Sequence, residues 1–322
     1  MMKQKLLSAA ILASSLFTGI ASAADYTLKF GHLANDDNVW NKAALHFQKT
    51  VEEKSEGRIE VLVYPNSELG SEMDIINGIQ LGTVDLTISG ESLQNWAPKA
   101  ALLAIPYAIR DSEHLAAVAN GEVGKEIEEQ ITQRSGLVPL TWFERGARNL
   151  TSNKPITTPE DLNGTILRVP NVPIFVKVWE QLGAKPTPMA FSEVFTSLQQ
   201  GTIHSQENPL SLINSASFFE VQGYVNKTEH VRSWIYVVMG KRQLEKLPKD
   251  LQAVVKEAAA ETQAYERELF LEDERKLAEL LQERGMKFVD VDQEAFREAA
   301  LPAVRKSLNK EQLPLFEDIQ KL

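Results

Sequence analysis

The sequence predicts an exported α/β protein with two similar lobes. Three observations lead to this fold class. An N-terminal leader precedes the folded part, short strand and helix patterns alternate along the chain, and one helix–Gly-Thr–strand unit occurs twice. Alternating strands and helices are typical of a largely parallel sheet covered by helices.

The first residues have the features of a cleaved signal peptide. Lys3 and Lys5 precede a mostly apolar run, Leu6–Ile20, and Ala21-Ser22-Ala23 provides a small-x-small cleavage site. The run is too short and too polar at its centre to span a membrane well, and no later stretch approaches a span. We predict cleavage near Ala23 and an exported mature chain without direct membrane insertion.

The composition excludes several classes of protein. The chain of 322 residues has 34 Lys and Arg against 44 Asp and Glu, so its formal net charge is −10, and loss of the two leader lysines makes it −12. An acidic chain without basic runs is a poor partner for nucleic acid or anionic membranes. The absence of cysteine excludes disulfides, a thiol nucleophile, thiolate zinc sites and a lipoprotein anchor.

The first part of the mature chain alternates strand and helix patterns. Period-two alternation predicts the strands, and apolar residues three or four apart predict the helices. Trp40, Ala43, Phe47 and Val51 share one face of the first helix, which is expected to end at Gly57. The other elements in order are strand Tyr26–Phe30, strand Ile59–Tyr64, turn Pro65–Ser67, helix Ile75–Leu81 and strand Val84–Ser89.

The same order of elements returns later in the chain. The helix before Gly82-Thr83-Val84-Asp85 matches a helix before Gly201-Thr202-Ile203-His204, which indicates two similar lobes. The predicted elements are strand Val138–Phe143, a short helix Pro159–Leu162 capped by Thr158, strand Thr165–Pro170, helix Pro173–Leu182 closed by Gly183, and a helix capped by Ser192 that ends at Gly201.

The last third of the chain has a different character. Between Pro248 and Arg284 no glycine or proline interrupts a run of good helix formers. One straight helix of this length would measure about 55 Å, which is longer than one lobe. Two helices with a bend and one helix lying across both lobes both fit the pattern. Met286–Val291 is predicted as the final strand.

No pattern indicates a catalytic centre or a metal site. Nucleotide-binding glycine loops, the GxSxG nucleophile motif and HExxH are all absent. We therefore expect no cofactor, no metal and no enzyme activity. The five histidines have no metal-binding spacing and fit core or surface positions: His32, His46, His114, His204 and His230.

Two arginines are candidates for binding a carboxylate. Arg168 ends a predicted strand, and Arg148 lies within the segment 143–153. Ligands bind open α/β sheets at strand ends, and a guanidinium can hold a carboxylate through two parallel hydrogen bonds. Structural salt bridges are the alternative for both arginines. In the same way, Phe191 fits a core position, and Asn208 before Pro209 fits a turn.

Five blocks of sequence lie in order over nearly the whole mature chain. They are Leu28–His32, Tyr64–Gly70, Leu167–Asn171, a block made of Pro186–Phe195, Leu198–Ile203 and Gln206–Pro209, and Phe218–Gln222. Together they resemble the solute receptors of tripartite ATP-independent periplasmic (TRAP) transporters, the C4-dicarboxylate and sialic acid receptor type. The resemblance implies a periplasmic location and the membrane subunits of such a transporter as partners.

The resemblance also implies a periplasmic binding protein fold, in which two α/β lobes enclose one ligand and a long helix spans both lobes. Arg168 would hold the ligand carboxylate with Arg148 as a second arginine, and Asn208 and Phe191 would contact the ligand. Further residues of the matching blocks expected at this site are His32, Asn171 and Glu207.

One block departs from the family pattern. The family often has Asp-Gly shortly before Glu-Asn-Pro, whereas this chain has His204-Ser205. This departure leaves the predicted fold unchanged, but it affects the expected preference among similar ligands. Asn38, Glu72 and Glu91 would offer hydrogen bonds to ligand hydroxyls if they face the cleft. Exposed loop and helix-start positions are the alternative for these three residues.

We therefore predict a receptor that closes by hinge motion on a sugar acid, such as a uronate, an aldonate or a keto-gulonate. The alternatives are a C4-dicarboxylate or sialic acid receptor, a secreted sugar-acid enzyme on a similar scaffold, and a signalling receptor of the same fold. Residues 24–147 with 236–275 are expected to form lobe 1, and 148–235 with 276–322 lobe 2.

Overall fold

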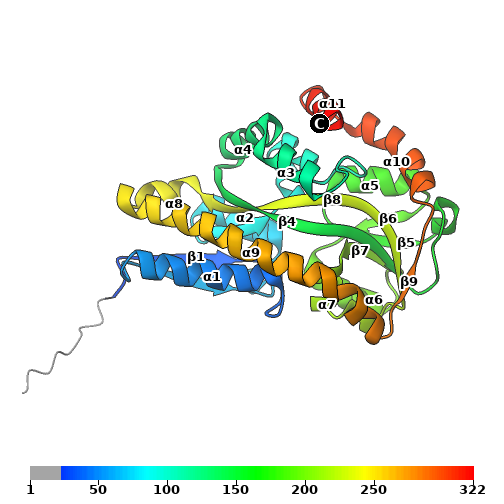
Figure 1. The fold of residues 1–322 in the computed structure, drawn as a ribbon, viewed down its shortest axis with the longest axis horizontal. Helices are drawn as coiled ribbons and strands as arrows, with labels where there is room; N and C mark the ends of the chain where they lie inside the picture. The colour runs from blue at the N-terminus through cyan, green and yellow to red at the C-terminus, as the bar shows by residue number, and fades with distance from the viewer. Residues whose placement is uncertain (1–22) are drawn as a thin grey trace, which may run out of the picture.

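The computed structural model describes residues 23–322, so the predicted signal peptide lies outside the described residues except for its last position. The described strands form one nine-stranded sheet in the order β2-β1-β3-β8-β4-β7-β5-β6, with β9 beside β8 (Figure 1). The strands are β1 Tyr26–Gly31, β2 Ile59–Tyr64, β3 Leu86–Ser89, β4 Leu137–Ser152, β5 Ile166–Val169, β6 Lys185–Pro188, β7 Ser205–Pro209, β8 Tyr224–Gly240 and β9 Lys287–Val289.

Helices cover both faces of this sheet (Figure 1). The α-helices are α1 Val39–Lys54, α2 Glu72–Leu81, α3 Ser112–Asn120, α4 Glu122–Ser135, α5 Pro173–Gln181, α6 Val194–Gln199, α7 Leu210–Ser215, α8 Lys241–Lys246, α9 Lys249–Glu283, α10 Gln293–Ser307 and α11 Leu313–Lys321. The short 3-10 helices are η1 Glu91–Asn95, η2 Pro98–Ala104, η3 Pro159–Leu162, η4 Phe191–Glu193 and η5 Phe218–Glu220.

Two strands run through the whole sheet and join its parts (Figure 1). β4 has 16 residues and β8 has 17, so the predicted strand Val138–Phe143 is only the first part of β4. One end of this antiparallel pair lies beside β1, β2 and β3, here called the N-terminal half-sheet. The other end lies beside β5, β6, β7 and β9, the C-terminal half-sheet. The β4–β8 register shifts between Arg145 and Arg148, where the two half-sheets meet.

The repeated Gly-Thr unit has the same geometry in both half-sheets. Gly82 after α2 and Gly201 after α6 both have positive φ, +85° and +70°, which end each helix in the left-handed conformation that glycine tolerates. The Thr83 hydroxyl then donates to the Gly78 carbonyl, and the Thr202 hydroxyl donates to the Ser197 carbonyl. Each unit leads into a strand that pairs in parallel, β3 with β1 and β7 with β5.

The expected N-cap at Ser192 is wrong. The helical segment begins earlier, because Phe191–Glu193 forms the 3-10 turn η4 that leads directly into α6. The Glu193 carboxylate accepts a hydrogen bond from the Ala190 backbone N–H and so caps the turn instead.

The long C-terminal segment forms one helix. α9 has 35 residues, or about 52 Å at 1.5 Å per residue. Leu251 and Val255 near its start pack into the core formed with α1 and β1, whereas Leu281 near its end packs with α6 and α7. α9 therefore lies along both half-sheets, as Figure 1 shows, and the alternative of two bent helices is wrong.

The apolar cores lie on both faces of the sheet. One cluster fills the space between the N-terminal half-sheet, α1 and α9. A larger cluster lies on the opposite face and contains apolar side chains of α2, α3, α4, α5, α10 and α11. A third, small cluster lies under α6 and α7. None of the helices within residues 23–322 is both long enough and apolar enough to cross a membrane.

Candidate functional site

A cavity of about 380 Å³ lies where the two half-sheets meet. Its walls come from strands and from the segments that follow them, as is usual for ligand sites of open α/β sheets. From the N-terminal half these are Leu33, Ser67, Ser71, Glu72, Met73, Glu91 and Ser92; from β4 and the C-terminal half they are Arg145, Arg148, Arg168, Pro170, Asn171, Pro188, Met189, Ala190, Phe191, Glu193, Asn208 and Leu212. We call this cavity the cleft.

Arg168 is a buried cation that has no carboxylate partner among the residues that the structure describes. It lies in β5, its side chain is only 3% exposed, and it lines the cleft. Its Nε and Nη2 donate to the Met189 carbonyl at 3.0 and 2.7 Å, and no ion pair joins it to any carboxylate of residues 23–322. Burial lowers the pKa of Arg168 to about 10, so the guanidinium stays charged at neutral pH.

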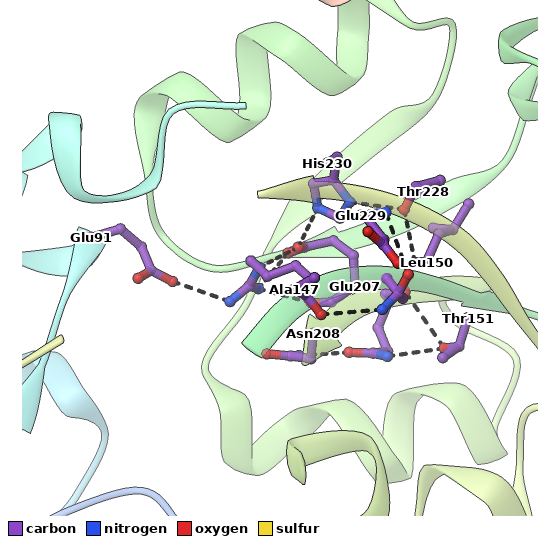
Figure 2. A network of polar contacts seen from close by, with 12 residues as sticks. Glu91, Ala147, Leu150, Thr151, Glu207, Asn208, Thr228, Glu229 and His230 are labelled. Atoms are coloured by element: carbon purple, nitrogen blue, oxygen red, sulfur yellow. Dashed lines mark hydrogen bonds and ion pairs between the residues drawn. The ribbon is translucent and has the colours of Figure 1, made fainter. Parts of the chain in front are cut away.

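Arg148 is held by a carboxylate behind the cleft wall. Its Nε and Nη2 donate to the two oxygens of Glu207 at 2.5 and 2.7 Å, a bidentate ion pair. His230 Nε2 lies 2.9 Å from the same carboxylate, and Thr228 lies 2.9 Å from His230 Nδ1. Burial opposes the charge of Glu207, yet Arg148 and His230 hold the pKa of Glu207 at about 2. Figure 2 shows this network around Glu207, His230 and Thr228.

Glu91 joins the two halves of the cleft. It begins η1, and Figure 2 shows its side chain pointing toward the network from a separate segment of the chain. Its carboxylate accepts from Arg145 Nη1 and, at 3.3 Å, from Arg148 Nη1. Burial disfavours a charged Glu91, but the two guanidinium groups outweigh it and place the pKa of Glu91 below its usual value.

Within residues 23–322, the hydrogen-bond partners of the Glu72 carboxyl group are neutral hydroxyls. This carboxyl group at the start of α2 accepts hydrogen bonds from the hydroxyls of Ser89 and Ser92 at 2.6 and 2.8 Å. Burial, followed by the charge of Glu91, raises the pKa of Glu72. The wall opposite Arg168 thus has two carboxyl groups and several serine hydroxyls, and these groups suit hydroxyl-bearing ligands.

Three further predicted residues line the cleft. The Asn208 amide in β7 is oriented by donating to Gln206 at 2.6 Å. The Phe191 ring packs edge-on against Phe218 and lies 5.9 Å from the Arg168 guanidinium, within cation–π distance. Asn171, after β5, accepts through its carbonyl from Asn95 of η1 and so connects the two walls.

The structure places three predicted site residues away from the cleft. Glu207 is next to Asn208 in β7, and because side chains alternate along a strand it points behind the wall toward Arg148. Asn38 caps α1 by accepting from the Trp40 backbone N–H. His32 is buried beside Phe30, and burial lowers its pKa to about 4. These three side chains are not among the residues that line the cleft, and the sequence blocks alone could not separate such positions from cleft-lining ones.

Arg145 was not predicted as a site residue. It lines the cleft, is 8% exposed, and its guanidinium carbon lies 5.5 Å from the centre of the Trp40 ring. The sequence offered one signal, because Arg145 and Arg148 are three residues apart in one strand segment. The shift of register between them brings both side chains toward Glu91, and nothing in the sequence indicated that shift.

A cleft between two α/β half-sheets is typical of a solute-binding protein when, as among residues 23–322, its buried guanidinium is anchored to a backbone carbonyl but has no carboxylate partner. Comparison with known proteins agrees with this class. The sequence profile described as bacterial extracellular solute-binding protein, family 7, matches residues 30–311. The chain belongs to this family, the periplasmic solute-binding proteins of TRAP transporters, whose members are transport receptors and not enzymes.

Several relatives are similar over almost their full length. A TRAP periplasmic solute-binding protein of Roseobacter denitrificans, solved with bound L-galactonate, is 55% identical with a TM-score of 0.91, covering 92% of this chain and 99% of that one. A Polaromonas relative bound to D-erythronate is 33% identical with a TM-score of 0.88, covering 92% and 99%. The 2,3-diketo-L-gulonate-binding periplasmic protein of Escherichia coli is 32% identical over 90% of this chain and 89% of its own length.

Proposed function

We propose that this receptor captures a sugar acid with one carboxylate, an aldonate in the first place, and delivers it to the membrane subunits of a TRAP transporter. The observation that carries the proposal is Arg168, a buried guanidinium that lines the cleft and has no carboxylate partner in the described part of the chain. A buried charge is costly without a partner, so the ligand carboxylate is the group that completes this site.

The opposite wall favours hydroxyl groups over a second carboxylate. Ser67, Ser71 and Ser92 line it together with Glu72 and Glu91, which supplies hydrogen-bond donors and acceptors but no unpaired cation. Relatives with bound L-galactonate and D-erythronate, both polyhydroxy monoacids, support the same ligand class. A C4-dicarboxylate receptor, the alternative, would need a second cation free to bind the second carboxylate.

The test is a thermal-shift screen of the purified mature protein. L-Galactonate, D-erythronate, a hexuronate, succinate and a sialic acid are compared at equal concentration. A ligand at 1,000 times its dissociation constant stabilises the folded state by about 4 kcal/mol. We expect the largest rise in melting temperature from a polyhydroxy monoacid. A screen in which only succinate raises the melting temperature would overturn the proposed ligand class.

We further propose that the chain works as two lobes that close on the ligand. Lobe 1 comprises residues 24–147 and 236–275, and lobe 2 comprises 148–235 and 276–322. The register shift of the β4–β8 pair between Arg145 and Arg148 supports a hinge at this point. Small-angle scattering with and without the best ligand tests closure, since a hinge predicts a smaller radius of gyration on binding.

Family membership does not support the alternative of a secreted sugar-acid enzyme on a similar scaffold. The cleft has paired carboxylates and guanidiniums, but family membership favours release of an unchanged ligand. Mass spectrometry after long incubation with excess L-galactonate should recover all of it unchanged, and turnover of the excess would support the enzyme instead. Genes for transporter membrane subunits beside this gene would support transport over a signalling role.

A further inference from the structure

We propose that the ion pair of Arg145 and Glu91 is a charge filter that restricts the cleft to ligands with a single negative charge. This inference rests on the proposed function, because it assumes that Arg168 holds the first carboxylate. It concerns the other end of the ligand, where the cleft must distinguish a hydroxyl group from a second carboxylate.

The pair is built into the cleft wall. Arg145 and Glu91 both line the cavity and are 8% and 4% exposed. Arg145 Nη1 donates to one oxygen of Glu91, while Arg148 Nη1 lies 3.3 Å from the other oxygen. The Arg145 guanidinium carbon also lies 5.5 Å from the centre of the Trp40 ring, within cation–π distance, which is a second contact that holds its position.

The charges around the cleft leave one position for a ligand anion. Arg148 is neutralised by Glu207, and Arg145 is neutralised by Glu91. Arg168 is the cleft-lining arginine that has no carboxylate partner among residues 23–322. A second carboxylate on the ligand would therefore meet no uncompensated cation, and it would lie on a wall that contains Glu72 and Glu91.

The same ion pair suits hydroxyl groups. Arg145 Nε is buried without a hydrogen-bond partner among the described residues, so this side chain is not saturated by the protein. A guanidinium beside a carboxylate presents donors and acceptors side by side, and a polyol chain offers both functions from each hydroxyl. A ligand carboxylate offers acceptors only, so it would compete with Glu91 for Arg145.

The decisive variant is Glu91→Gln. It removes the negative charge, keeps the shape of the side chain and leaves Arg145 without a counter-charge. The probes are L-galactonate and galactarate, which differ by oxidation of the terminal CH₂OH to a second carboxylate. The wild-type protein should bind L-galactonate at least about tenfold more tightly than galactarate. In Glu91→Gln the ratio of the two dissociation constants, galactarate over L-galactonate, should be at least about tenfold lower than in wild type.

Three further variants complete the test, two as independent checks and one as a control. The double variant Arg145→Gln with Glu91→Gln removes both charges and should restore the preference for L-galactonate. Arg145→Met removes the cation while Arg148 still contacts Glu91, so the preference for L-galactonate over galactarate should increase. This variant provides an independent test if Glu91→Gln does not fold. Glu283→Gln, an exposed carboxylate at the end of α9, is the control for net charge and should leave the ratio unchanged.

Calorimetric titrations at fixed ionic strength measure the ratio. Two results would overturn the charge filter. One is a ratio in Glu91→Gln that stays within threefold of the wild-type ratio. The other is a wild-type protein that binds both acids equally. Failure of the wild-type protein to bind any sugar acid would instead overturn the proposed function. The two failures are therefore distinguishable in one set of experiments.

Discussion

Replacing Arg168 separates ligand binding from folding. In Arg168→Ala the ligand carboxylate would enter a desolvated cleft without its charge-assisted partner. Loss of one member of such a buried pair costs about 2–5 kcal/mol, or roughly 30-fold to several-thousand-fold in affinity. We therefore expect binding of the best sugar acid to fall below measurement at ordinary protein concentrations.

The folded state should tolerate this substitution. Arg168 donates to the Met189 carbonyl and is joined to no protein carboxylate within residues 23–322, so its loss leaves no buried negative charge unpaired. Arg168→Lys keeps the charge but loses the planar pair of donors, and it should recover only part of the affinity.

Calorimetric titration together with thermal melts of the unliganded variants checks both statements. If Arg168→Ala binds the ligand within threefold of wild type while remaining folded, the arginine is structural and the carboxylate binds elsewhere. That result would refute the assignment of Arg168.

The remaining predictions concern stability and maturation. Arg148→Ala removes the bidentate guanidinium partner of the buried Glu207 carboxylate and leaves it with the His230 imidazole. Urea denaturation should therefore show a loss of about 3–5 kcal/mol, and an unchanged stability would contradict the importance of the ion pair. Burial lowers the pKa of His32 from 6.5 in the unfolded chain to about 4 in the folded protein. The unfolded chain therefore binds a proton at His32 more readily as the pH falls from 6.5 toward 4. The free energy of unfolding should fall by about 3 kcal/mol over this range, and this contribution is fully present above pH 6.5. His32→Gln should remove that part of the pH dependence, and parallel curves for variant and wild type would argue against it. Mass spectrometry of the exported protein should give a mature N-terminus at Ala24, whereas an intact leader would contradict cleavage.

Much of the fold was predictable because local patterns agree with it. The strands Ile59–Tyr64 and Ile166–Val169 are short apolar or alternating segments bounded by turns, and the Gly-Thr unit recurs with the same capping geometry. α9 was predictable as helix, but the sequence left open whether it bends. Tertiary contacts decide this point, because apolar side chains at both ends of α9 pack against the two half-sheets and stabilise a single continuous helix.

The long strands were the main omission. Residues Glu144 to Arg148 of β4 contain three charged side chains, and hydropathy assigns such residues to the surface. In the structure all three are buried, because Glu144 contacts Arg267 of α9 while Arg145 and Arg148 contact Glu91 and Glu207. Partners distant in sequence make this burial possible, and no local pattern reveals them.

The candidate site was predictable to a similar extent. Arg168 followed from its position at a strand end and from the family resemblance, and the structure brings it together with Asn208 and Phe191. Glu207 belongs to the same sequence block, yet strand alternation turns it behind the wall. Neighbouring residues of a motif can therefore differ in role, and only the direction of each side chain decides between ligand contact and support.

The central claim is that Arg168 holds the single carboxylate of a sugar acid. A crystal structure of the protein with L-galactonate tests it most directly. We expect the ligand carboxylate within about 2.7–3.2 Å of the Arg168 guanidinium, with the hydroxyl chain extending toward Glu72 and the Arg145–Glu91 pair. A carboxylate bound instead at Arg145 or Arg148, with Arg168 contacting only the protein, would contradict the account.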